Sequence, residues 1–303
     1  MPRYLHAPTR RRPELSQHFA RDTVADLIAE RLPAHPRLVL EAGAGHGAIT
    51  HALAGRGFRV VAVEKDPALF LLLASRFAAW PNVDCRPGDF LDAVLPHEPY
   101  AFVSNVPFGI TAALIDKLLG ASRPPEHSLL VVQREAAERF TGRPRQTRIA
   151  LLHNPWFDFT VEHSFRRDDF IPAPSVDCTL MRIARRPRPL VPRSLRTEYL
   201  EFINAAFGTR RQQARDALRG YFTERQIVRL ARDLGFGRNA RPSEIGFEAW
   251  LGLFRFHVQG RLGRAPRRRT HPLPGTTRAT GRLTEWLHNA KLVTRREMRL
   301  PTS

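Results

Sequence analysis

The chain contains few cysteines, no long hydrophobic run and no secretory signal. Two cysteines, Cys85 and Cys178, are too few for a disulfide framework or a cysteine-ligated zinc site, which suits a reducing compartment. The longest apolar run, residues 68–74, is far shorter than the roughly 20 residues that a membrane-spanning helix needs. The N-terminus is basic but has no apolar segment of the kind found in secretory signals. These absences predict a cytoplasmic protein with no membrane segment.

Acidic residues are scarce relative to basic ones, and lysine is scarce among the basic residues. The 303 residues include 48 Lys and Arg against 29 Asp and Glu, a formal net charge of +19, and only three of the 48 are lysine. Arginine suits phosphate oxygens and stacks on bases, although a GC-rich genome would also replace lysine by arginine without a functional reason. That explanation does not account for the net charge, which predicts a polyanionic partner.

The first 184 residues alternate strand-like and helical segments, which predicts an α/β fold with a parallel sheet covered on both faces. Strands are expected at 37–41, 59–63, 83–86, 100–104 and 128–133. Helices are expected at 23–32, 46–54, 67–79 and 111–119. Two later strand-like runs, at 157–165 and 178–183, have no helix between them and could add an antiparallel edge.

A proline-rich basic segment at 185–194 predicts a linker and a change of architecture. Beyond it, apolar residues at helical spacing predict a small all-helical domain. Its helices are expected at 195–207, 211–221, 223–234 and 243–257. The predicted organisation is a flexible basic arm (1–13), an α/β domain (14–184), a helical domain (185–259) and a basic, disordered tail (260–303). The tail has a net charge of +9 and a short helix is expected around 283–292.

The segment VLEAGAGHGAIT, residues 39–50, places Gly43, Gly45 and Gly47 between a predicted strand and a predicted helix. Glycines there let the backbone turn tightly and let a ligand lie against the main chain. The segment also fits the pattern G-x-G-x-x-A, so the glycines alone leave a dinucleotide site open, as well as a turn that binds nothing.

An acidic residue lies at the end of each of the first three predicted strands. Glu64 lies 19 residues after Gly45, where a carboxylate can accept hydrogen bonds from both ribose hydroxyls of an adenosine-type ligand. Asp89 could accept from an adenine amine. Glu41 would repel a pyrophosphate and favours a cationic ligand. S-adenosylmethionine satisfies all three expectations, because it carries a ribose, an adenine and a positive sulfonium.

The fourth predicted strand ends in Asn105-Val106-Pro107-Phe108. The amide oxygen of Asn105 and a nearby backbone carbonyl could hold the hydrogens of an exocyclic amine, and the ring of Phe108 could stack on the base. Catalysis would then consist mainly of aligning the nitrogen with the methyl group of the sulfonium. A proline turn that merely ends a strand is the alternative interpretation.

Together these residues resemble the rRNA adenine-N6 methyltransferases, the family that contains the Erm macrolide-resistance enzymes and the KsgA-type small-subunit dimethylases. The resemblance covers about residues 14–257 and includes these segments in the family's order: ELSQHF (14–19), EAGAGHG (41–47), VVAVEKD (60–66), GDF (88–90), NVPF (105–108), QREAAERF (133–140) and FIPAPSVD (170–177). It implies a Rossmann-like methyltransferase domain followed by a helical RNA-binding domain.

The resemblance also implies roles for individual residues. Cofactor contacts are expected at His18, Ala20, Gly43, Gly45, Glu64, Asp89 and Asn105. Asn105 and Phe108 are expected to be catalytic, and Phe108 and Phe170 to hold the target adenine. The sequence departs from the family at His18, where Asn is usual, and at Phe108, where Tyr is commoner; the first departure puts the contact by residues 16–20 in doubt and adds a titratable group.

An arginine cluster after the fifth predicted strand, which includes Arg139 and Arg143, is expected to contact RNA, although it could be only a solvated face. No metal site is expected, because the histidines are scattered, and we expect a monomer. A closer resemblance to high-GC Erm proteins is carried by the segments at 154–159 and 184–191 and by the basic tail. It implies that the substrate is the adenine in the peptidyl-transferase loop of nascent or protein-poor 23S rRNA. It also implies resistance to macrolides, lincosamides and streptogramin B.

Three alternatives remain at this point. One is a KsgA-type 16S rRNA dimethylase that acts in ribosome assembly, and another is a non-catalytic rRNA-binding factor that retains the fold. A small-molecule methyltransferase fits the glycine loop but not the charge of +19.

Overall fold

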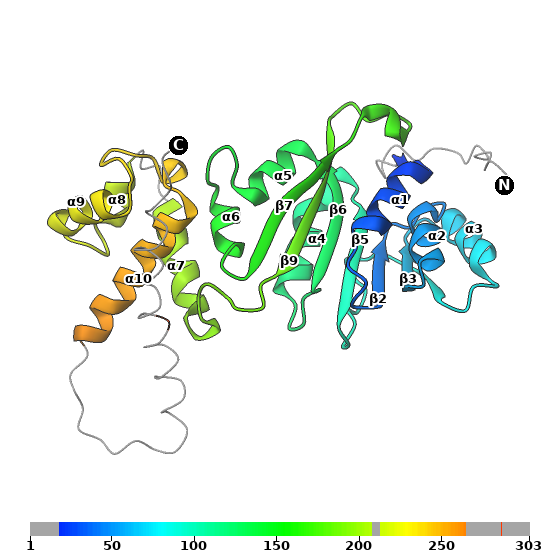
Figure 1. The fold of residues 1–303 in the computed structure, drawn as a ribbon, viewed down its shortest axis with the longest axis horizontal. Coiled ribbons are helices and arrows are strands. Elements are labelled where there is room, and N and C mark those ends of the chain that lie inside the picture. Colours follow the sequence, from blue (N-terminus) through cyan, green and yellow to red (C-terminus); the bar gives the residue numbers. More distant parts are fainter. Residues whose placement is uncertain (1–17, 208–212, 265–285, 287–303) are drawn as a thin grey trace, which may run out of the picture. The chain divides into compact units, whose positions relative to one another are not determined.

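A computed structural model describes residues 18–207, 213–264 and 286, which form two compact units (Figure 1). The sheet unit comprises the described residues up to 141 together with 157–187, and the helical unit comprises 142–156 and the described residues from 188 onward. The predicted arm (1–13) lies outside the described residues, as does the predicted tail helix except for Trp286.

The sheet unit is built on seven strands in the order β4-β3-β2-β5-β6-β9-β7. The five strands from β4 to β6 are parallel, and β9 and β7 extend the sheet as an antiparallel edge. Their bounds are β2 Leu38–Ala42, β3 Arg59–Glu64, β4 Val83–Pro87, β5 Tyr100–Asn105, β6 His127–Gln133, β7 Phe157–Ser164 and β9 Cys178–Arg185. The predicted α/β fold, its strands and its antiparallel edge are confirmed.

The helices of the sheet unit bury their apolar residues against the strands. Ile28 of α1 and Leu53 of α2 are fully buried in one core with Val39 and Val103 of the sheet, and α4 buries a second set that includes Leu114 and Leu118. The helices are α1 Asp22–Arg31, α2 Ala48–Gly55, α3 Pro67–Phe77, α4 Thr111–Gly120 and α5 Arg134–Thr141. Because removal of apolar surface from water drives this packing, the helices hold the carboxyl ends of the parallel strands in fixed register.

A two-stranded antiparallel pair lies apart from the main sheet. β1 (Phe19–Ala20) pairs with β8 (Phe170–Ile171), so that Ala20 lies opposite Phe170. This pair brings the start of the described chain beside a segment about 150 positions later. It was not predicted.

The helical unit consists of α6 Arg148–His153, α7 Arg196–Phe207, α8 Ala214–Leu218, α9 Glu224–Asp233 and α10 Phe247–Arg264. Its interior is aromatic: Tyr199, Phe202 and Trp250 are fully buried. The sequence predicts one boundary after residue 184, whereas the division in the structure also assigns 142–156 to the helical unit. The reason is α6, whose Leu151 carbonyl accepts a hydrogen bond from the Tyr199 hydroxyl at 3.0 Å.

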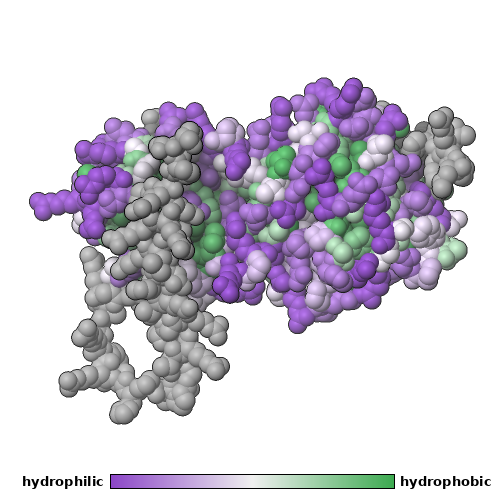
Figure 2. Space-filling model, in the orientation of Figure 1, coloured by the Kyte–Doolittle hydropathy of each residue, from purple (hydrophilic) through white to green (hydrophobic). Residues whose placement is uncertain are grey.

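Hydrophilic residues cover much of the face shown in Figure 2. Among the described residues, no helix is both long enough and apolar enough to cross a lipid bilayer.

Candidate active site

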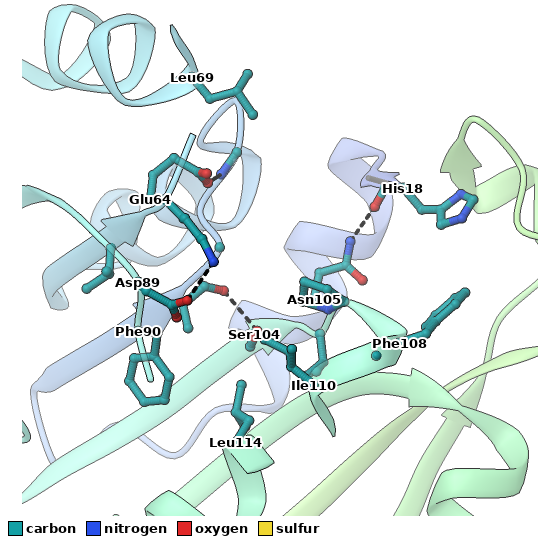
Figure 3. Close-up of a pocket in the computed structure, with 18 of the residues that line it drawn as sticks. His18, Glu64, Leu69, Asp89, Phe90, Ser104, Asn105, Phe108, Ile110 and Leu114 are labelled. Atoms are coloured by element: carbon teal, nitrogen blue, oxygen red, sulfur yellow. Dashed lines mark hydrogen bonds and ion pairs between the residues drawn. The ribbon is translucent and has the colours of Figure 1, made fainter. Parts of the chain in front are cut away.

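A pocket of about 270 Å³ opens at the carboxyl ends of the central parallel strands (Figure 3). β2 leads into it through Gly43, β3 ends in it at Glu64, β4 is followed by Asp89, and β5 ends in it at Asn105. In an open parallel sheet, the loops after neighbouring strands diverge at this edge and leave a crevice for a ligand. Two of the three acids predicted at the strand ends, Glu64 and Asp89, are therefore brought together.

The glycine loop contributes Gly43 and Gly45 to the lining of this pocket, and it requires glycine for two separate reasons. Gly43, Gly45 and Gly47 have φ values of 68°, 56° and 81°, in the left-handed region that L side chains rarely adopt. A Cβ on Gly45 would also lie 3.1 Å from the ring of Phe19, and one on Gly47 would lie 2.5 Å from the ring of Phe77. The loop thus brings bare backbone to the pocket, as its glycines predict.

Glu64 is buried, with 6% of its surface exposed, and its carboxylate is anchored by two backbone N–H groups. The N–H of Gly45 donates to Oε2 at 2.7 Å and the N–H of Asp66 donates to Oε1 at 2.8 Å. A carboxylate has about four acceptor positions. Two bonds fix its plane and leave acceptor capacity for the hydroxyls of a ribose.

Asp89 lies at the mouth of the same pocket and is paired with Lys65. Lys65 Nζ donates to Asp89 Oδ2 at 2.7 Å, and the N–H of Leu91 donates to Oδ1 at 2.8 Å. The hydrogen bond from Lys65 is the main cause that lowers the pKa of Asp89, and the bond from Leu91 adds to it. Asp89 is therefore an ionised acceptor at neutral pH.

Asn105, Phe108 and His18 lie together on the opposite side of the pocket from Glu64 (Figure 3). Asn105 Nδ2 donates to the backbone carbonyl of His18 at 2.5 Å, so the amide oxygen remains available as an acceptor. The rings of His18 and Phe108 are stacked, with centroids 5.5 Å apart and planes at 25°. His18 Nδ1 donates to the carbonyl of Pro172 at 2.8 Å, which fixes its ring.

Glu41 does not have the role that the sequence predicts for it. The residue is 1% exposed and is not among the residues that line the pocket. Thr50 Oγ1 donates to its Oε2 at 2.6 Å, and burial raises the pKa of Glu41 to about 8. The prediction that its charge repels a pyrophosphate is wrong, because Glu41 is buried against Thr50 outside the pocket lining, and its burial favours the neutral acid.

The remaining predicted site residues lie in different surroundings. Phe170 lines the pocket but is only 2% exposed, with its ring edge-on to Phe165. Ala20 pairs with the lining residue Phe170 in the β1–β8 pair and is not itself part of the lining. Arg139 on α5 and Arg143 are exposed and lie outside the pocket. Their predicted contact with RNA stays a prediction.

Several lining residues were not predicted, among them Lys65, Ser104, Leu114 and Cys178. Ser104 Oγ donates to the carbonyl of Ala42 at 2.8 Å and so ties β5 to β2 beside the pocket. The sequence carries a signal for Lys65 only, since it follows Glu64 directly and is one of three lysines in the chain. Among the described residues, no group of three His, Cys, Asp or Glu side chains is placed to hold a metal ion.

Comparison with known proteins gives consistent matches. The model of the family described as ribosomal RNA adenine dimethylase matches residues 9–255. An rRNA adenine N-6-methyltransferase of Saccharopolyspora erythraea is 34% identical over 249 residues, which are 81% of this chain and 65% of that protein, so the chain matches less than two thirds of that relative's length.

Two further proteins extend the comparison. Ribosomal RNA small subunit methyltransferase A of a Synechococcus strain is 33% identical over 80% of this chain and 91% of its own length. The crystal structure of the 23S rRNA methyltransferase ErmE superposes with a TM-score of 0.74 and 32% identity, covering 80% of this chain and 99% of that one.

Proposed function

This chain belongs to the ribosomal RNA adenine dimethylase family, and on that premise we propose that it transfers methyl groups from S-adenosylmethionine to N6 of one adenine in 23S rRNA. The observation that carries the proposal is the convergence of Glu64, Asp89 and Asn105 on one pocket at the carboxyl edge of the sheet. Glu64 suits the ribose and Asp89 the adenine of an adenosine-type cofactor, and Asn105 suits the exocyclic amine of a target adenine.

The residues that line the pocket suit the separate parts of S-adenosylmethionine. The bare backbone at Gly43 and Gly45 admits the methionine portion of the ligand without a Cβ in the way, Glu64 would accept from the ribose hydroxyls, and Asp89 would accept from the adenine amine. When bound, the cofactor supplies a methyl group activated by a positive sulfonium. Glu64 and Asp89 both line the pocket, and two acids there would favour a cationic ligand over a pyrophosphate.

Asn105 and Phe108 would position the target adenine. The lone pair of an exocyclic amine is delocalised into the ring, which makes the nitrogen a poor nucleophile. The Asn105 amide oxygen would accept one hydrogen of the amine while the ring of Phe108 stacks on the base, so that the nitrogen is held toward the methyl group. His18, locked by the carbonyl of Pro172, supports Phe108 by stacking on it.

The charge of the chain supports a polyanionic substrate. With a net charge of +19, the protein would gain affinity for RNA through release of counterions from phosphates. The exposed Arg139 and Arg143 would contribute to this contact. The large-subunit RNA is favoured because ErmE is matched over 99% of its length. We further infer that the substrate is nascent or protein-poor RNA, because the peptidyl-transferase loop is crowded in an assembled ribosome, and we propose that the protein acts as a monomer.

A small-subunit substrate is the second candidate, and the match to 91% of the Synechococcus small-subunit methyltransferase favours it. Incubating both rRNAs with the protein and S-adenosylmethionine, followed by mass mapping and primer extension, separates the two. We expect a single modified adenine in the peptidyl-transferase loop of 23S rRNA, and tolerance to macrolides and lincosamides when the protein is expressed in a sensitive bacterium.

Two other outcomes would contradict the proposal in different ways. Modification confined to adenines near the 3′ end of 16S rRNA would establish the small-subunit assignment. RNA binding without any methyl transfer would indicate a non-catalytic rRNA-binding factor.

A further inference from the structure

Two of the three lysines in the chain lie beside the loop that follows β4. Lys65 Nζ donates to Asp89 Oδ2 at 2.7 Å, and Lys117 Nζ donates to the backbone carbonyl of Leu91 at 2.7 Å. Lys117 also lies 5.7 Å from the centre of the Phe90 ring. In a chain with 45 arginines, the loop that would meet the cofactor's adenine is thus contacted by lysine on two sides.

The geometry around Asp89 explains why an ammonium suits this position. Each carboxylate oxygen accepts one hydrogen bond, Oδ2 from Lys65 and Oδ1 from Leu91. An ammonium acts as a compact point donor and occupies one acceptor position, whereas a guanidinium fork tends to occupy both oxygens at once. The ion pair with Lys65 therefore fixes the Asp89 carboxylate and leaves acceptor positions on it for a ligand.

A carboxylate outside the pocket has both oxygens occupied by guanidinium groups, although each arginine engages one oxygen. Asp177 is engaged at Oδ1 by both Nε and Nη2 of Arg167, at 3.2 and 3.1 Å, and at Oδ2 by Nη1 of Arg134, at 3.3 Å. Three guanidinium nitrogens surround this acid, which does not line the pocket. Asp89 has one cation at hydrogen-bonding distance and does line it.

We propose that Lys65 is a positioning residue for Asp89. It holds the Asp89 carboxylate in the orientation that accepts a hydrogen bond from the 6-amino group of the cofactor's adenine. Lys65 thereby sets the preference of the pocket for a 6-amino over a 6-oxo purine. This inference rests on the proposed function, because it assumes that the pocket binds an adenosine-type cofactor. A 6-oxo purine presents an acceptor where the carboxylate needs a donor, so the discrimination depends on how firmly the carboxylate is held.

The test compares two ligands that differ at one position of the purine. Isothermal titration of the full-length protein with S-adenosylhomocysteine and with S-inosylhomocysteine gives the ratio of the two affinities. Lys65→Met keeps the straight side chain and removes the charge. We expect this variant to bind S-adenosylhomocysteine about tenfold more weakly than the parent and S-inosylhomocysteine within about twofold of the parent affinity. The ratio of the two affinities should therefore fall at least fivefold.

A matched control corrects for the loss of one positive charge. Arg86 on β4 forms an exposed ion pair with Asp84 at 2.7 Å, outside the pocket, and Arg86→Met should leave both affinities and the ratio unchanged. Asp89→Asn should lower the ratio by itself, and adding Lys65→Met to it should produce no further decrease, because Lys65 acts through Asp89.

The possible failures are distinguishable. A parent protein that binds neither ligand overturns the proposed cofactor, and this inference with it. If the parent protein binds S-adenosylhomocysteine and the Lys65→Met variant has the same ratio of affinities as the parent, the inference about Lys65 is wrong and the proposed cofactor stands. An equal decrease with Arg86→Met would show that the effect is one of net charge, and would also overturn it. Lys65 is 61% exposed at its side chain, so thermal unfolding of the Lys65→Met variant should match that of the parent.

Discussion

The side-chain amide of Asn105 donates a hydrogen bond to the backbone carbonyl of His18, 87 positions earlier in the chain, at 2.5 Å. A carbonyl only accepts, so this contact requires the NH₂ group of Asn105 to face His18 and its oxygen to face the pocket. The first described residue of the chain therefore determines the orientation of the amide at the end of β5. The same residue stacks on Phe108, so both groups proposed to hold the target adenine depend on it.

Asn105→Ala should abolish methyl transfer and leave RNA binding near normal, since the amide is within the pocket and the arginines proposed to bind RNA are elsewhere. Asn105→Asp should be nearly as inactive, because a carboxylate oxygen cannot donate to the His18 carbonyl. Labelled methyl incorporation and a gel-shift titration measure the two properties. A rate above about a tenth of the parent rate, a loss below about 1.4 kcal/mol, would contradict the role given to Asn105.

Phe108→Ala should lower methyl transfer about 10- to 100-fold, because stacking of a base on an aromatic ring is worth about 1–3 kcal/mol. Phe108→Tyr keeps the ring and should retain most of the activity. Cofactor affinity, measured by titration with S-adenosylhomocysteine, should change little in either variant. Equal activities of the alanine and tyrosine variants would show that the ring does not hold the base.

The parallel sheet could be predicted because its central strands are apolar at nearly every position, as strands buried on both faces must be. All five residues of β2 are buried, for example. The β1–β8 pair could not be predicted, because two-residue strands carry no periodicity and their partners are about 150 positions apart. Helices α5 and α6 were also missed, because their eight and six residues are too few to show a helical repeat. The equally short α2 could be predicted because a glycine loop marks its start.

The candidate site could be predicted where residue type and strand end coincide, as at Glu64 and Asn105. The surroundings of each side chain could not be predicted, because they depend on contacts that only the folded chain supplies. Glu41 and Glu64 end neighbouring strands as similar carboxylates, yet Glu64 accepts two backbone hydrogen bonds beside the pocket, whereas Glu41 is buried against Thr50. The ion pair of Lys65 with Asp89 likewise joins residues 24 positions apart on loops whose separation the sequence does not reveal.

Glu64→Gln should weaken S-adenosylhomocysteine binding at least tenfold. The parent carboxylate accepts from the N–H groups of both Gly45 and Asp66. A glutamine has one acceptor oxygen, so its NH₂ group would face one of these donors and disturb the glycine loop as well as the ribose contact. Isothermal titration measures the loss, and Asp84→Asn, at an exposed acid on β4 outside the pocket, serves as a control. An unchanged affinity of Glu64→Gln for S-adenosylhomocysteine would show that Glu64 does not bind the ribose.

Glu41→Gln should stabilise the protein, and the gain should grow as the pH rises from 5 to 8. Burial raises the pKa of Glu41 from an ordinary value of 4.5 to about 8 in the folded protein. Below about pH 4.5 both the folded and unfolded states bind the proton, so stability is unaffected by this group. Between the two pKa values the unfolded state ionises and the folded state does not, so the parent loses stability as the pH rises, at up to about 1.4 kcal/mol per pH unit.

A glutamine has no such titration, and its amide oxygen can still accept the hydrogen bond from Thr50. The difference in urea midpoint between the variant and the parent should therefore increase from pH 5.5 through 6.5 to 7.5 and level off above pH 8. Thr50→Val, which removes the donor and keeps the β-branched shape, should destabilise the parent and raise the pKa of Glu41 further, since the hydrogen bond from Thr50 opposes the effect of burial. Parallel pH profiles of stability for Glu41→Gln and the parent would mean that Glu41 is ionised in the folded protein. A carboxyl group that is charged in both the folded and unfolded states takes up no proton on folding between pH 5.5 and 7.5, so it adds no pH dependence there.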